Sequence, residues 1–293
     1  MRPRSLMFTL FGDYIQYYGD EIWIGSLIHF MNQFGISESS VRGAIFRMVN
    51  QGLIKPRKIG NKSYYSLTET GRRRIEDGVR RVYAIKHHKW DGYWRILIYS
   101  VPEEKRQLRT QLRKELSWTG FGLITNSTWV SPNPLEHQIV EMVKTYNLEE
   151  YIYFFTSSSV LSHDNQELIN KGWKLAELEE EYNQFINHYS PRYAALQEQS
   201  WQGTLTDQQC FYERTCLVHE FRKFLFKDPL FPIDLLPENW SGFKARELFW
   251  QIHQLVSTGA VRYFEKYFET APDRKYETNR EKAINPFMEI YFS

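Results

Sequence analysis

Residues 39–47 combine side chains that could contact a nucleic acid. At 100° per residue along a helix, the aliphatic residues of this stretch fall on one side. The other side and its flanks are small, cationic and able to form hydrogen bonds, and they comprise Ser39, Ser40, Arg42, Gly43, Phe46 and Arg47. Arginine can contact base edges or phosphates, and glycine lets the backbone approach a groove wall. The pattern predicts a helix that enters the major groove of duplex DNA.

A second group of polar and cationic residues lies at the tip of a predicted β-hairpin. Two strand-like runs, residues 53–57 and 63–67, flank a turn that contains Gly60. The group comprises Arg57, Lys58, Asn61 and Lys62. Because a basic hairpin beside a recognition helix touches the neighbouring DNA, we expect these side chains to contact the backbone or the minor groove.

The elements that must position both groups fit a winged helix-turn-helix. Apolar residues recur every three or four positions over residues 4–18 and 23–34, which predicts two amphipathic helices. Gly35 permits the turn that follows, and Ser37 is a suitable N-cap for a third helix that runs to about Gln51. Three helices followed by a basic hairpin are the expected order of a winged-helix head.

Charge is distributed unevenly along the chain. Residues 1–89 carry 15 Lys or Arg against 7 Asp or Glu, a net charge of +8, whereas the whole chain carries 37 against 35. The remainder is therefore acidic, at −6. A basic head on an acidic body suits a protein in which one end alone attracts a polyanion.

The composition excludes several classes of protein. No run approaches the length of about 18 apolar residues that a membrane span needs, so we expect a protein of the cytoplasm with no membrane partner. The two cysteines, Cys210 and Cys216, are too few for a disulfide scaffold and lack zinc-site spacing. Known motifs for nucleotide binding, nucleophilic catalysis and metalloprotease zinc sites are absent. We therefore expect no enzyme, no metal and no cofactor.

Two groups of short motifs resemble those of a known family. In the head, they are SVRGAIFRM at 40–48, GLI at 52–54 and SYYSLTETG at 63–71. In the tail, they are LVHEFRKF at 217–224, DP at 228–229, LLP at 235–237 and WSG at 240–242. Together they resemble the PaaX family, bacterial repressors of phenylacetate catabolism, and the resemblance covers nearly the whole chain. It implies a transcriptional repressor that phenylacetyl-CoA, the suspected effector ligand, releases from operator DNA.

The middle of the chain predicts a small ferredoxin-like α+β unit. Strand-like and helical patterns alternate, with strands at 93–100, 122–130 and 151–156 and helices at 103–118 and 135–146. This unit resembles the Cas2-like domain of PaaX proteins. Nucleases of the Cas2 type place a metal-binding aspartate at the end of the first strand, where this chain has Ser100, and Asp91 precedes that strand. We therefore interpret the unit as a dimerisation and coupling module, with Arg106, Arg109 and Arg113 solvated or paired.

The predicted fold class is a multidomain α+β chain in three parts. These are a winged-helix domain with a linking helix at 1–89, a ferredoxin-like domain at 90–165 and a mostly helical effector domain at 166–293. The effector domain offers cations and aromatic side chains that an aromatic acyl-CoA requires, namely His219, Arg222, Lys223, Phe224 and Trp240. Core packing and internal ion pairs would explain the same residues.

These features favour the hypothesis of a homodimeric repressor that binds double-stranded operator DNA and an acyl-CoA effector. A metal-dependent nuclease built on the middle unit is one rival. A DNA-binding protein without an effector is the other.

Overall fold

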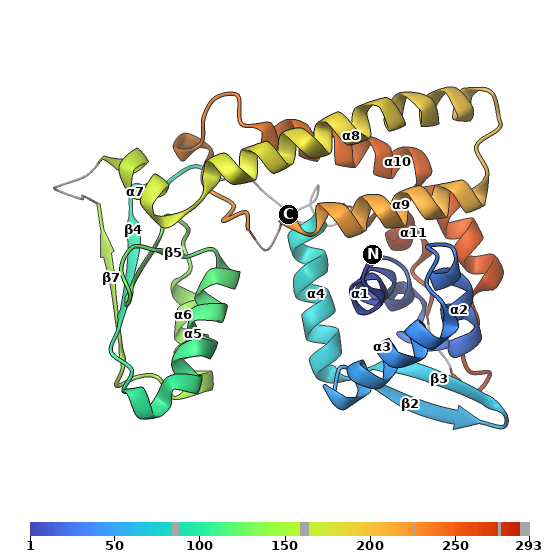
Figure 1. Cartoon of the computed structure of the whole chain (residues 1–293), viewed down its shortest axis with the longest axis horizontal. Helices are drawn as coiled ribbons and strands as arrows, with labels where there is room; N and C mark the ends of the chain where they lie inside the picture. The colour runs from blue at the N-terminus through green and yellow to red at the C-terminus, as the bar shows by residue number, and fades with distance from the viewer. Residues whose placement is uncertain (84–87, 159–163, 225–226, 275–276, 288–293) are drawn as a thin grey trace. The chain divides into compact units, whose positions relative to one another are not determined.

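The structure is a computed structural model that describes the chain except for residues 84–87, 159–163, 225–226, 275–276 and 288–293 (Figure 1). It divides into two compact units. The first comprises Met1–Ile85, Ile186–Lys223 and Arg246–Ser293, and the second comprises Lys86–Phe185 and Phe224–Ala245. Each unit thus combines parts that lie far apart in the sequence. The domain boundaries expected after residues 89 and 165 remain predictions.

The first unit begins with the elements of the predicted head. The helices are α1 Pro3–Asp13, η1 Ile15–Tyr18, α2 Ile24–Asn32, α3 Glu38–Asn50 and α4 Glu69–Tyr83. The strands β1 Glu21–Trp23, β2 Ile54–Ile59 and β3 Lys62–Leu67 form an antiparallel sheet in the order β1-β3-β2. Helix α4 lies where the sequence predicts the linking helix of the head, and residues 84–87 lie outside the described residues. Strand β1 was not expected from the sequence.

The single helix expected over residues 4–18 is two elements. Tyr14 leaves the helical region, with φ −136° and ψ −64°, so α1 ends at Asp13 and a short 3-10 helix follows. Tyr14 takes this conformation at the centre of an aromatic core. Its ring centroid lies 5.2 Å from that of Phe211 and 5.2 Å from that of Phe264. The packing of these rings fixes α1 against residues from the other end of the chain.

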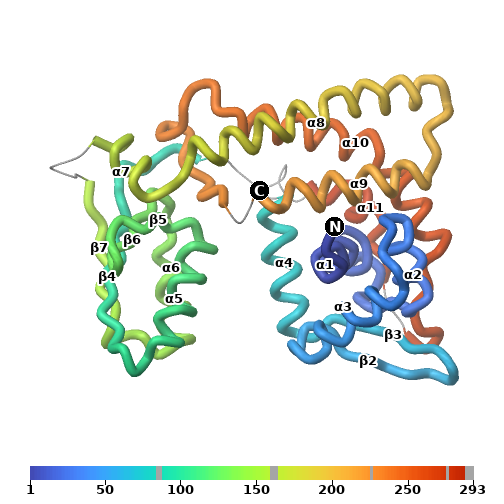
Figure 2. Tube along the Cα trace, viewed as in Figure 1, coloured from blue at the N-terminus to red at the C-terminus, as the bar shows by residue number. Residues whose placement is uncertain are grey.

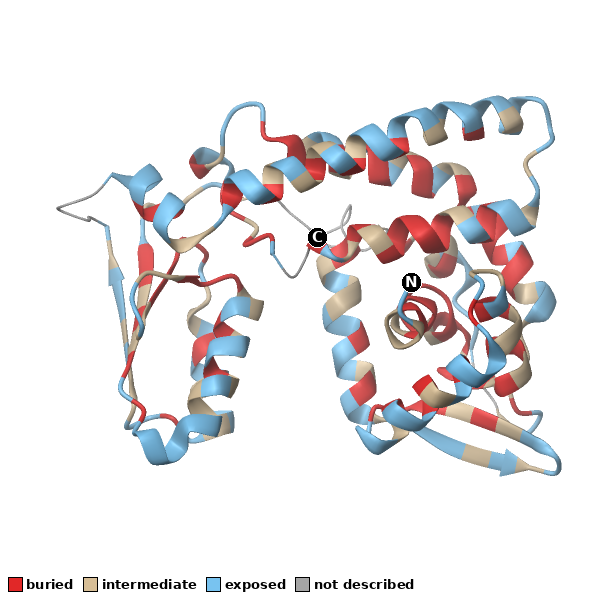
Figure 3. Ribbon diagram, in the orientation of Figure 1, coloured by how far each residue is buried: buried red, intermediate tan, exposed pale blue. Residues whose placement is uncertain are grey.

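The first unit also contains helices from later in the chain. They are the second part of α8 Leu175–Trp201, α9 Asp207–Phe221, most of α10 Ser241–Tyr267, and α11 Arg280–Ile284. Helix α1 packs against α9, α3 and α4, as the tube in Figure 2 shows. Buried residues lie along both α1 and α9 (Figure 3), and Phe211 of α9 packs on Tyr14 at the end of α1. The head is therefore not an independent lobe, because C-terminal helices complete its core.

A buried ion pair joins α1 to α9 within this core. Arg214 donates from Nε to Asp13 Oδ2 and from Nη2 to Asp13 Oδ1, both at 2.9 Å, and both side chains are 1% exposed or less. Tyr83 on α4 donates to Asp13 Oδ1 at 2.5 Å. Burial is the strongest single influence on Arg214 and lowers its pKa, but Asp13, Tyr14 and Tyr83 together outweigh burial and raise that pKa. The two charges therefore stay paired inside the unit.

The second unit is built on a four-stranded antiparallel sheet. Its strands are β4 Trp94–Tyr99, β5 Gly122–Leu123, β6 Thr128–Ser131 and β7 Ile152–Ser157, in the order β5-β6-β4-β7. The first strand lies between the third and the last, which is the ferredoxin-like order. One predicted strand, 122–130, is two strands here, because residues 124–127 form a turn.

Helices cover one face of this sheet. They are α5 Arg106–Thr119, which follows the 3-10 turn η2 Glu103–Lys105, and α6 Glu136–Tyr146. Leu97 and Tyr99 of β4, Leu112 and Leu116 of α5, and Trp129 of β6 share one buried cluster. Helix α7 Asn165–Gly172, the start of α8 and the 3-10 turn η4 Ile233–Leu235 complete the unit.

Candidate nucleic-acid interface

Helix α3 has one sealed face and one open face. Val41, Ala44 and Met48 are completely buried against the rest of the head. Arg42 and Arg47 are exposed, and Phe46 leaves 67% of its surface in solvent. An exposed phenylalanine between two arginines is unusual on a solvated helix, since burial of its ring would be favourable. The open face is suited to a partner that accepts both charge and apolar contact.

The first turn of α3 presents hydroxyl groups. Ser37 caps the helix by accepting from the backbone N–H of Ser40 at 3.4 Å. The Ser37 Oγ also lies 3.1 Å from Ser39 Oγ and 3.0 Å from Ser40 Oγ. All these serines are exposed, so hydrogen bonds to an approaching phosphate or base can replace the hydrogen bonds among them.

Arg42 and Arg47 are available to a ligand in different degrees. Arg42 pairs with Glu38 at 2.7 Å, with both side chains 56% exposed, and such exposed pairs contribute little to stability. Arg47 has no hydrogen bond or ion pair from its side chain among the described residues. A Cβ on Gly43 would lie 3.6 Å from Arg47 Nη1, an ordinary contact. The fold itself therefore does not require glycine at position 43.

The hairpin cations fall into two groups. Lys58 and Asn61 are exposed at the tip, where Gly60 adopts φ +56°. Arg57 instead donates to Glu21 at 2.9 and 3.2 Å and to Asp273 at 3.0 Å. These hydrogen bonds, with Glu21 the stronger influence, raise the pKa of Arg57.

Lys62 is also held by the C-terminal segment. Its Nζ lies 2.5 Å from Glu269 Oε1 and 4.5 Å from the centroid of the Trp23 ring. The Trp23 backbone N–H donates to the Glu269 carbonyl at 2.8 Å, which joins the C-terminal segment to the edge strand β1. Local sequence patterns could not predict the pairing of Lys62 with Glu269, because more than 200 residues separate the two.

The residues expected to bind an effector separate into two places. His219 Nδ1 forms a hydrogen bond with Thr9 Oγ1 at 3.0 Å, and Arg222 donates to the Ser5 carbonyl at 2.6 Å. Both partners belong to α1, in the first unit. Lys223 is exposed. Burial, reinforced by the Arg222 and Lys223 charges, lowers the pKa of His219 to about 3.

Arg222 has a lowered pKa and an incomplete set of hydrogen bonds. Burial alone lowers its pKa to about 10, and its Nε has no hydrogen-bond partner among the described residues.

The other two predicted residues, Phe224 and Trp240, lie in the second unit. Their rings pack around Tyr182, with centroids 4.3 and 5.9 Å from it, and both are buried. Three of the five predicted residues therefore belong to the first unit and two to the second, with the boundary between the consecutive residues Lys223 and Phe224.

The middle unit carries no carboxylate at the position where Cas2-type nucleases place their metal-binding aspartate. Ser100 follows β4, and its backbone N–H donates to the Tyr151 carbonyl at 2.8 Å. Asp91 is bound by Arg95, which also donates to Glu136 at 2.6 Å. Arg106 and Arg113 are exposed, and Arg109 pairs with Glu103 at 2.8 Å. Within the described ranges, no three His, Cys, Asp or Glu side chains could share a metal ion, and no helix could cross a membrane.

Comparison with known proteins decides the family. Three family profiles match in chain order: PaaX-like protein over residues 2–71, PaaX protein central Cas2-like domain over 87–169, and PaaX-like protein C-terminal domain over 173–266. This chain belongs to the PaaX family. These matches confirm the predicted fold class of an N-terminal domain, a Cas2-like α+β domain and a helical C-terminal domain. They divide the chain differently from the compact units, which share the helices of the C-terminal domain.

Two relatives extend the comparison. Transcriptional repressor PaaX of Escherichia coli (strain K12) is 31% identical over 270 residues, which span 91% of this chain and 84% of that protein. The chain is therefore a homologue of a transcriptional repressor, which implies a regulator rather than an enzyme. The structure of an uncharacterized protein from Mycobacterium tuberculosis has a TM-score of 0.51 at 20% identity. It covers 83% of this chain and 90% of that one, and at this identity the likeness concerns the fold alone.

Proposed function

We propose that this PaaX family chain represses transcription by placing α3 in the major groove of operator DNA. One observation carries the proposal: α3 leaves Arg42, Phe46 and Arg47 open while its aliphatic face is sealed. A glycine that the fold does not require lies on the same face, where a groove wall would approach. The name of the Escherichia coli relative, a transcriptional repressor, supports the same role.

The hairpin would contact DNA beside α3. Two of its residues, Lys58 and Asn61, are exposed and available for this contact. To bind DNA, Arg57 and Lys62 must replace their carboxylate partners within the protein with phosphates of the DNA. Helix-turn-helix proteins commonly bind as dimers to half-sites about 34 Å apart, and we propose a homodimer of this kind in the cytoplasm. A duplex with two half-sites one helical turn apart is the expected target.

Selection from a pool of randomised duplexes tests the DNA-binding role. Immobilised full-length protein should enrich one sequence with two related halves. We expect the enriched duplex to bind at least about 1,000-fold more tightly than an unrelated duplex at the same salt concentration. A pool that shows no enrichment, or equal affinity for both duplexes, would rule out sequence-specific repression.

The proposed effector is phenylacetyl-CoA, and the proposed targets are genes of phenylacetate catabolism. The family resemblance supports both. Arg222, with Lys223 and His219 beside it, is a cation without a carboxylate partner among the described residues and could bind a phosphate of such a ligand. Phe224 and Trp240 belong to the second unit and are candidates for a further contact with the ligand.

A release titration tests this effector. Phenylacetyl-CoA should lower the affinity for the selected duplex, and free phenylacetate and free coenzyme A should each have a much smaller effect. A regulator releases DNA only when its ligand favours the state that binds DNA poorly. If none of the three compounds changes the affinity, the chain is a DNA-binding protein without this effector.

A further inference from the structure

A cavity of about 720 Å³ lies beside helix α5 in the second unit. Arg113, Lys114 and Trp118 line it from α5, at the spacing of one helix face. Leu123 of β5 and Trp129 of β6, which are paired across the sheet, line the opposite side. The volume falls in the range of pockets that bind small molecules and cofactors. Every residue that lines the cavity belongs to the second unit.

The charge of this cavity favours an anion. Arg113 and Lys114 are exposed, and neither side chain has an ion pair among the residues that the structure describes. No Asp or Glu lines the cavity. An entering carboxylate or phosphate would therefore meet two cations without displacing an acidic side chain.

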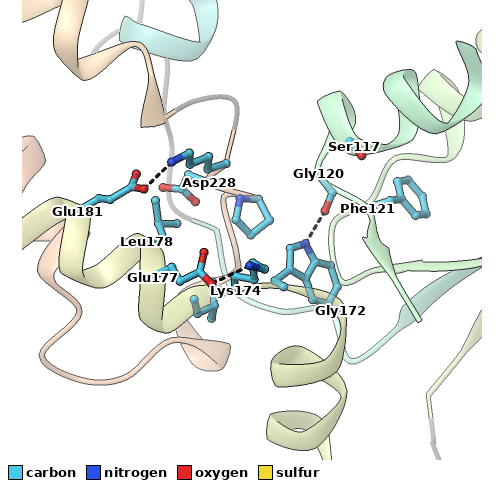
Figure 4. Close-up of a pocket in the computed structure, with 13 residues that line it drawn as sticks. Ser117, Gly120, Phe121, Gly172, Lys174, Glu177, Leu178, Glu181 and Asp228 are labelled. Carbon is cyan, nitrogen blue, oxygen red and sulfur yellow. Dashed lines mark hydrogen bonds and ion pairs between the residues drawn. The ribbon is translucent and has the colours of Figure 1, made fainter. Parts of the chain in front are cut away.

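The neighbouring cavity, shown in Figure 4, has the opposite character. Its volume is about 320 Å³, and its cations are already neutralised. Lys174 donates to Glu177 at 2.7 Å, and Lys227 pairs with Glu181. Of these two cavities, the larger one is the better anion site.

The inner wall of the larger cavity is aromatic. Trp118, Phe121 and Trp129 all line it, which suits a flat ring. Trp129 is 3% exposed, yet its indole Nε1–H has no hydrogen-bond acceptor among the described residues. A buried donor without an acceptor is unfavourable and rare in folded proteins, so the site lacks a hydrogen-bond acceptor. The Nε1 atom itself is buried, so a ligand carbonyl oxygen would supply this acceptor only after the Trp129 side chain moves toward the cavity.

We propose that this cavity binds an aromatic acyl compound that carries negative charge. The ring packs against Trp118 and Phe121, the carbonyl oxygen accepts from Trp129 Nε1–H, and Arg113 and Lys114 bind the carboxylate or phosphates. This inference rests on the proposed function, because it gives the effector a place in the Cas2-like domain. It is an alternative to binding of the anion at Arg222.

Direct binding to the full-length protein tests the site, by calorimetry with phenylacetyl-CoA, coenzyme A and phenylacetate as separate probes. The variant Arg113→Ala/Lys114→Ala removes the cavity cations. Its matched control, Arg106→Ala/Lys144→Ala, removes two exposed cations of the same unit that do not line the cavity. We expect the first variant to weaken phenylacetyl-CoA binding about ten- to a hundredfold and the control to change it less than about twofold.

Trp129→Phe keeps the ring but removes the donor. We expect binding about two- to tenfold weaker. In the wild-type protein, the indole resonance that this variant lacks should shift downfield when phenylacetyl-CoA is added. Both cavity variants should bind the selected duplex as the wild type does when no ligand is present, which shows that they are folded.

Three results would overturn the assignment. Full binding by the cavity variant, with binding lost in Arg222→Gln/Lys223→Ala, would place the effector at the other group and leave the proposed function intact. Failure of all three probes to bind a wild type that still binds its duplex would reject the cavity and the effector, but not DNA binding. A change from dimer to monomer in the cavity variant would show that a second copy covers this wall.

Discussion

Neutralising the acids that hold the hairpin should strengthen DNA binding. Glu269 pairs with Lys62, and Asp273 pairs with Arg57, so the C-terminal segment occupies two cations that face the proposed DNA. In Glu269→Gln/Asp273→Asn, Arg57 keeps its hydrogen bonds to the buried Glu21, and the hairpin should stay in place. Duplex DNA would then meet two cations without competition from these acids.

The size of the effect follows from the exposure of these pairs. Each has side chains 39% to 60% exposed, and pairs of this kind contribute at most about 1 kcal/mol. Removing both competitors should therefore tighten binding by roughly tenfold. If both cations gain phosphate contacts, the slope of log affinity against log salt should steepen by up to about 2. The free energy of unfolding should change by less than about 1 kcal/mol.

Fluorescence anisotropy between about 50 and 200 mM salt measures both quantities, with a selected and an unrelated duplex. Glu177→Gln/Glu181→Gln is the matched control, since it removes two acids that pair with lysines in the second unit. Both duplexes should gain affinity in the hairpin variant, because phosphate contacts carry no sequence information. Equal affinities of wild type and hairpin variant, or an equal gain in the control, would refute a hairpin that approaches DNA.

Three further predictions concern the stability of the first unit. A Cβ on Gly71 would lie 1.9 Å from a backbone carbonyl oxygen, so Gly71→Ala should cost about 2 kcal/mol or more in urea unfolding, whereas Gly78→Ala on the same helix, with open space around it, should be neutral or stabilising. Asp13→Asn should cost about 3 to 5 kcal/mol, because it leaves Arg214 buried and unpaired, and the added change Arg214→Met should recover part of that loss if the pair is internal. The pKa of His219 in the folded protein is near 3, below its ordinary value, so the free energy of unfolding should fall as pH drops below about 6.5, by on the order of 1 to 2 kcal/mol at pH 5. His219→Gln should flatten this pH dependence. The same pH dependence in the variant and the wild type would contradict the prediction.

Local patterns were enough to predict the recognition helix and the hairpin. The aliphatic spacing of α3, its Ser37 cap and the Gly60 turn act within a few residues, so their structure follows from the chain nearby. The exposure of Arg42 and Arg47 follows from the same periodicity.

Other features depend on contacts between distant segments, which a single sequence does not reveal. Tyr14 interrupts the first helix because Phe211 and Phe264 pack on it, and Glu269 orders Lys62 from the far end of the chain. The assignment of Arg222 and Trp240 to different compact units has the same origin, since these units share the C-terminal helices. Sequence chemistry suggested residues for effector binding, which stay a prediction, but could not assign them to a unit.

The most direct test of the central claim is the affinity of Arg47→Ala for the selected duplex and for duplexes changed at one base pair. The open face of α3 predicts a loss of about 1 to 3 kcal/mol and weaker discrimination at one position. Arg73→Ala, an exposed arginine of α4 that pairs with Glu69, is the control and should leave specificity unchanged. Wild-type affinity and specificity of Arg47→Ala at every salt concentration would contradict the claim that α3 reads DNA.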